Sequence, residues 1–117
     1  MSFPYAPQVV AKLALTGQTT AISPTTVFTT TEEGDYQIST YLSVSSAFAG
    51  TVYTALAYTD EYGNLAGPGT ACGGVGSNNA GYSEVMVHTV SGSTIQLSTT
   101  YTGGTGPYDV FVTVTQF

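Results

Sequence analysis

Apolar and polar residues alternate along most of this 117-residue chain, and this period of two constrains the fold more than any other feature. Between Gly34 and Val44 the even-numbered positions are apolar residues or threonine, and the positions between them are mostly polar. Successive side chains of a β-strand point to opposite faces, so the segment is predicted to be a strand with one buried side. No segment keeps an apolar face at helical spacing beyond two turns, so we expect almost no helix.

The same alternation recurs between turn residues that are spaced about ten residues apart. Small residues at Ala49 and Gly50 separate the strand at 34–44 from the one at 52–59, which predicts a hairpin. The stretch Gly67–Gly81 lacks alternation and is predicted to be a long exposed loop. The full set of expected strands is Val9–Leu15, Gly34–Val44, Val52–Thr59, Tyr82–Val90, Thr94–Thr102 and Tyr108–Phe117, with shorter ones at Thr19–Ile22, Thr25–Thr31 and around Leu65.

About eight short strands rich in Thr and Val predict an all-β fold, an antiparallel β-sandwich of the jelly-roll kind. The length suits one domain, which we expect to span residues 9–117. Residues 1–8 are predicted to form an extended N-terminal arm that packs on its own sandwich or on a neighbour. The residues expected to be mostly buried are Ile38, Leu42, Leu56, Ile95, Leu97, Val110 and Val112.

Charged residues make up only 7% of the chain, against about 25% in an average domain. One lysine and no arginine among seven acidic residues exclude a basic groove for nucleic acid and attachment to an anionic membrane. Thr, Ser, Asn, Gln and Tyr must cover the surface instead, and such groups are less costly to desolvate than ions. This composition favours permanent contact with neighbouring protein chains. No secretory signal or membrane-spanning run is evident, so we expect synthesis in a host cytoplasm.

No residue constellation indicates catalysis, so we expect neither an enzyme nor a cofactor. His88 is the only histidine, and no serine lies in a Gly-x-Ser-x-Gly motif for it to activate. The carboxylates at Glu32, Glu33 and Asp35 come without the Trp residues that often line a sugar-cleaving cleft. The segment 60–64 lacks the spacing of a calcium loop and is read as a turn. A lone cysteine allows neither an internal disulfide nor a cysteine-based metal site.

Interface residues are a more promising class of candidate. Tyr41 and Tyr53 lie opposite the apolar files, where they could form an outward aromatic patch; cross-strand packing and sugar stacking are the alternatives. His88 is expected on a polar strand face at a subunit contact. The complete set of expected interface residues is Phe3, Pro4, Tyr5, Tyr41, Tyr53, Cys72 and His88.

Several runs give the chain a resemblance to a known module. They are Gly34–Leu42, Tyr58–Gly63, Gly92–Gly104 and Gly106–Val112. Together they are similar to a small β-sandwich module of the structural proteins of tailed bacteriophages and prophages, over residues 34–117.

The resemblance implies a component of a virus particle. It implies a head decoration (cement) protein when the module stands alone, and a fibre or spike tip when it is fused to a longer chain. A chain of 117 residues leaves no room for a fibre shaft, so we expect a decoration protein that binds across boundaries of the major capsid protein on the outer capsid surface. A homotrimer is expected because capsids present local threefold positions, with a dimer as the next choice. A receptor- or carbohydrate-binding module of a tail fibre or spike is the alternative.

Overall fold

The computed structural model describes residues 7–45, 48–67, 71–73 and 79–117. Every element in these residues is a β-strand, and all strand pairs are antiparallel. The strands are β1 Gln8–Gln18, β2 Thr25–Thr29, β3 Gly34–Val44, β4 Ala49–Asp60, β5 Gly63–Gly67, β6 Ala71–Gly73, β7 Asn79–Thr89, β8 Thr94–Thr105 and β9 Tyr108–Gln116.

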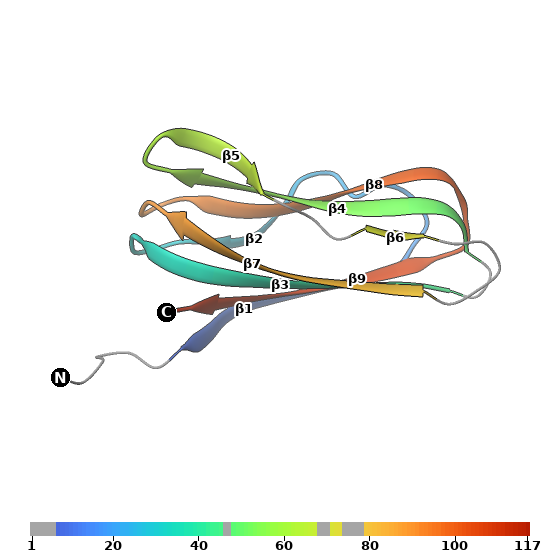
Figure 1. Ribbon diagram of the computed structural model, residues 1–117, viewed down its shortest axis with the longest axis horizontal. Helices are drawn as coiled ribbons and strands as arrows, with labels where there is room; N and C mark the ends of the chain where they lie inside the picture. Colours follow the sequence, from blue (N-terminus) through green and yellow to red (C-terminus); the bar gives the residue numbers. More distant parts are fainter. Residues whose placement is uncertain (1–6, 46–47, 68–70, 74–78) are drawn as a thin grey trace.

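The strands form two sheets packed face to face (Figure 1). Sheet A has the order β1-β9-β3-β7, and sheet B has the order β2-β8-β4-β5, with the short β6 also paired to β4. The chain passes repeatedly from one sheet to the other, so that most sequential neighbours lie in different layers. This arrangement is the predicted all-β jelly-roll sandwich.

The core lies between the sheets, where the alternating files of both layers meet. The seven residues expected to be buried are all at most 1% exposed, so the period-two assignment of the faces is confirmed. Threonines at positions 40, 54 and 99 are buried beside the apolar residues. The buried hydrophobic residues are Tyr36, Ile38, Leu42, Val44, Phe48, Val52, Leu56, Val87, Ile95, Leu97, Tyr108, Val110, Val112 and Val114.

The hairpin predicted between the third and fourth strands is wrong. β3 pairs with β7 and β9 in sheet A, whereas β4 pairs with β5, β6 and β8 in sheet B. The connection crosses between the layers, and it buries Phe48 completely. The apolar files of β3 and β4 therefore face each other across the core. Two strands in facing sheets and two strands paired in one sheet have the same alternating sequence pattern, so the pattern alone cannot distinguish the two arrangements.

Two further expectations need correction. The predicted loop Gly67–Gly81 contains β6, which pairs with β4, and the start of β7, which pairs with β3, because backbone pairing requires no large side chain. The piece Thr19–Ile22 is not a strand. There the Thr99 hydroxyl accepts a hydrogen bond from the amide of Ile22 at 2.7 Å, and the Thr99 amide donates to the Ile22 carbonyl at 3.0 Å. The hydroxyl of Thr99 thus accepts the hydrogen bond that a backbone carbonyl would accept in a regular β-ladder.

Candidate interaction surface

The outer face of sheet A carries a row of exposed aromatic side chains. In the strand register Tyr41 of β3 lies opposite Phe111 of β9 on one side and opposite Tyr82 of β7 on the other. The ring centroids of Tyr41 and Phe111 are 6.3 Å apart. Phe111, Tyr41 and Tyr82 are 39%, 43% and 59% exposed, so a large part of each ring contacts solvent. We call these three residues the aromatic row.

Polar groups border the aromatic row. The Tyr82 hydroxyl donates to Glu84 Oε1 at 2.7 Å, and the Gln37 side-chain amide donates to Glu84 Oε2 at 3.2 Å. Met86, two residues further along β7, is 56% exposed on the same face. An apolar centre with a polar rim is the usual anatomy of a protein interface, in which aromatic residues and Met are enriched.

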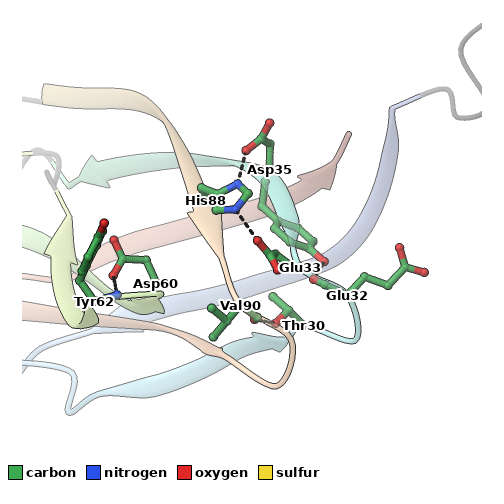
Figure 2. A network of polar contacts seen from close by, with 9 residues as sticks. Thr30, Glu32, Glu33, Asp35, Asp60, Tyr62, His88 and Val90 are labelled. Carbon is green, nitrogen blue, oxygen red and sulfur yellow. Dashed lines mark hydrogen bonds and ion pairs between the residues drawn. The ribbon is translucent and has the colours of Figure 1, made fainter.

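His88 lies on the same face beyond Met86, between two carboxylates (Figure 2). Its Nδ1 is 2.8 Å from Asp35 Oδ1, on the strand opposite it, and its Nε2 is 3.1 Å from Glu33 Oε2, in the turn before β3. All three side chains are more than half exposed. We call His88, Asp35 and Glu33 the histidine cluster.

The hydrogen bonds to Asp35 and Glu33 raise the pKa of His88 above its ordinary value of 6.5. Desolvation opposes this increase with a smaller effect on the pKa, and the negative charges of the same two carboxylates add to the increase. The cluster therefore holds its proton at a higher pH than a free histidine.

A hydrogen-bonded pair of turns fixes the position of Glu33 relative to β7. The Thr30 amide donates to the Ser93 carbonyl at 2.8 Å, and the Gly92 amide donates to the Thr30 carbonyl at 2.8 Å. The Thr30 hydroxyl donates to the Val90 carbonyl at 2.8 Å. These bonds tie the β2–β3 turn to the β7–β8 turn, so the carboxylate of Glu33 is held near the imidazole.

An open hollow of about 430 Å³ lies at the other end of the same sheet. Tyr41, Ser43, Ala80 and Asp109 contribute to its lining. Asp109 Oδ1 accepts a hydrogen bond from the amide of Gly17 at 2.8 Å. The hollow thus combines an aromatic ring with hydroxyl and carboxylate groups.

The structure brings together two of the interface residues expected from the sequence, Tyr41 and His88, on one face of sheet A. Tyr53 is 49% exposed but lies on β4 in sheet B, so the aromatic patch expected to contain both tyrosines does not exist. The backbone of Cys72 lies in β6 at the edge of β4. Phe3, Pro4 and Tyr5 lie outside the described residues.

The sequence did not indicate the partners that complete the surface. Phe111, Asp35 and Glu33 are close to the expected residues only because β9, β3 and β7 are neighbours in the sheet. Their alternation in the sequence gave the correct outward face, but only strand register shows which outward residues meet.

No metal centre or membrane span is found in the part of the chain that the structure describes. There, no group of three or more His, Cys, Asp and Glu side chains could hold a metal ion. No helix among the described residues has the length and apolar character to cross a bilayer. The segment 60–64 forms a tight turn from β4 into β5, in which Asp60 Oδ1 accepts from the amide of Tyr62 at 2.7 Å. The prediction of a turn is confirmed.

The fold is similar to several solved structures. The globular domain of a zebrafish complement 1qA protein has a TM-score of 0.61 and 11% sequence identity, and the match covers 90% of this chain and 95% of that chain. Eiger TNF from S. frugiperda has a TM-score of 0.55 at 12% identity, covering 92% and 85% of the two chains. Murine APRIL has a TM-score of 0.54 at 13% identity, covering 87% and 97%.

These identities show a shared jelly-roll fold and nothing more specific. No model of a protein family matches the chain, and no curated protein matches it.

Proposed function

We propose that the protein is a structural, non-enzymatic component of a virus particle that decorates the outer surface of the capsid as a homotrimer. Its partners in this proposal are further copies of itself and the major capsid protein. The observation that carries the self-association is the aromatic row on the outer face of sheet A.

The aromatic row provides an anchor of suitable size for contact between copies. Aromatic side chains bury about 150–250 Å² each, and roughly half of each ring in the row remains accessible. Three such rings offer roughly 300 Å² of apolar surface to a neighbour on each copy. The molecule measures 52 × 29 × 17 Å, so a broad face exceeds the roughly 800 Å² per partner of an ordinary stable interface.

The capsid partner is supported by different features. The runs Gly34–Leu42 and Gly92–Gly104 are similar to a module of bacteriophage structural proteins. The first run lies in β3, and the second contains the turn before β8 and most of β8. β3 is an inner strand of sheet A, and β8 is an inner strand of sheet B. A surface with few ions suits wide contact with a protein shell, because little charge must be desolvated.

The test compares particles with and without this protein. We expect heat resistance and composition of purified particles to change on its removal, and to be restored when the purified protein is added back. Deleting residues 1–8 should weaken binding to the particle and leave the far-UV circular dichroism spectrum unchanged. Particles whose composition and heat resistance are the same in both cases would contradict the proposal.

A receptor- or carbohydrate-binding role is the second candidate, favoured by the hollow beside Tyr41. An aromatic ring next to Ser43 and Asp109 is the combination that binds sugars, since the ring stacks on a pyranose while hydroxyl and carboxylate groups bind its hydroxyls. Glycan-array binding at micromolar affinity that is lost in Asp109→Ala would favour this role. The matched variant Asp60→Ala, in the turn after β4, should leave such binding unchanged.

A further inference from the structure

We infer that the contact between copies through the outer face of sheet A is strengthened by acid, with His88 as the sensor. This inference rests on the self-association in the proposed function and specifies its regulation. It follows from where the histidine cluster lies and from what surrounds it.

The histidine cluster lies on the same face as the aromatic row. Tyr82, Met86 and His88 are exposed residues of one outward file of β7. Alternate residues of a strand are about 7 Å apart, so the imidazole is one side chain away from Met86. A copy that covers the aromatic row and Met86 therefore brings its own surface close to the cluster.

The geometry of the cluster favours the doubly protonated imidazole. Both ring nitrogens are within hydrogen-bond distance of a carboxylate oxygen, at 2.8 Å to Asp35 and 3.1 Å to Glu33. A neutral imidazole carries one N–H, so it directs a lone pair at one of these two carboxylates. Only the imidazolium donates a hydrogen bond to both.

The groups facing the cluster are mostly acidic. Asp35 of β3 and Glu33 of the β2–β3 turn contact the imidazole. Glu32, in the same turn, is drawn with its carboxylate directed away from the ring (Figure 2), and Glu84 lies four residues earlier on β7, where it contacts Tyr82 and Gln37. Just after β9, the amide of Phe117 donates to the Asp35 carbonyl at 3.1 Å, which places Phe117 beside Asp35.

Few cations oppose these carboxylates. Lys12 is the only Lys or Arg residue in the sequence, and it lies on β1. His88 is therefore the one side chain in the sequence that can gain a positive charge near neutral pH.

Association makes the charge state matter more. With a neutral ring the cluster carries two negative charges, and protonation reduces this to one. Copies that exclude water from their contact lower the local dielectric, so repulsion between like-charged surfaces increases. Protonated copies therefore associate more tightly than neutral ones.

The pKa of His88 is raised above 6.5 by Asp35 and Glu33, and this sets the pH window. The protonated, more strongly associating form is complete below 6.5 and is lost as the pH increases through the raised pKa.

The experiment measures the dissociation constant of the oligomer by sedimentation equilibrium between pH 5.5 and pH 8.5. For the natural sequence we expect roughly three- to tenfold weaker association at the higher pH. His88→Gln retains hydrogen-bonding capacity without the charge, so its dissociation constant should not change with pH. Glu84→Gln removes a carboxylate from the same face but not from the cluster, so it should retain the dependence.

Distinct results separate this inference from the proposed function. An oligomer whose dissociation constant is the same at both pH values, or a dependence that persists in His88→Gln, overturns the inference and leaves self-association intact. A protein that stays monomeric at every pH refutes the self-association as well. Far-UV circular dichroism of each variant shows whether the fold is preserved.

Discussion

Tyr108 joins the segment before β2 to the core, and Tyr108→Phe measures how much this connection stabilises the fold. The Tyr108 hydroxyl donates to the Thr20 carbonyl at 2.6 Å and lies 2.7 Å from Thr99 Oγ1. Its single hydrogen goes to Thr20, so the Thr99 hydroxyl must be the donor in the second bond. That hydroxyl accepts in turn from the amide of Ile22 at 2.7 Å.

The magnitude follows from what the substitution leaves behind. Tyr108 and Thr99 are 1% and 6% exposed, so the Thr99 hydroxyl loses its acceptor at a site with little access to water. Thr20 is exposed, and its carbonyl can bind water instead. An unsatisfied buried hydroxyl costs about 1–3 kcal/mol, and we expect a loss of about 2 kcal/mol in the free energy of unfolding. At roughly 4 °C per kcal/mol for a chain of this size, the Tm falls by about 8 °C.

The assay is urea unfolding followed by circular dichroism, at one fixed protein concentration for all variants. Tyr62→Phe is the matched control because Tyr62 is 87% exposed, and it should change the free energy of unfolding by less than about 0.5 kcal/mol. Equal unfolding midpoints for the two variants would refute the reasoning about the buried hydroxyl.

Two further predictions concern the backbone and alkaline pH. Gly92 has a φ of +81°, and no atom lies within 4 Å of an added Cβ, so Gly92→Ala should lower the free energy of unfolding by about 1–2 kcal/mol through backbone conformation alone. Gly34 has no positive φ, so Gly34→Ala should lower it much less in the same urea assay. Burial raises the pKa of Tyr108 and of Tyr36 above 10.0, and proximity to Glu32 is the second cause for Tyr36. The contribution of the two neutral phenols to stability is therefore present below pH 10 and is lost as the pH increases through the raised pKa values. Thermal unfolding between pH 9 and pH 11.5 should show a falling Tm, with a smaller fall in Tyr108→Phe; a Tm that does not change over this range would contradict the assignment.

Strand faces could be predicted from the sequence because alternation is a local property. The buried file from Tyr36 to Val44 was assigned correctly, since each residue's side depends only on its neighbours along the chain. Pairing is not local in this way. The strands β3 and β4 are consecutive yet lie in different sheets, and the small residues Ala49 and Gly50 fit a crossover as well as a hairpin.

The candidate surface was predictable to the same extent. The outward positions of Tyr41 and His88 followed from alternation, and both are exposed. Their partners did not follow, because Asp35 lies 53 residues from His88 in the chain and meets it only through the β3–β7 register. Tyr53 shows the same limit, since its outward direction was correct while its sheet could not be known.

The most direct test of self-association through sheet A is the mass of the protein by sedimentation equilibrium at tens of micromolar, for the natural sequence and for two matched variants. Tyr41→Ser and Tyr53→Ser each remove one tyrosine, 43% and 49% exposed, from opposite faces of the sandwich. We predict a mass of about 36 kDa, three times the 12.1 kDa chain, for the natural sequence and for Tyr53→Ser, and a shift toward the monomer in Tyr41→Ser. A monomer mass for the natural sequence, or dissociation caused by Tyr53→Ser and not by Tyr41→Ser, would contradict the claim.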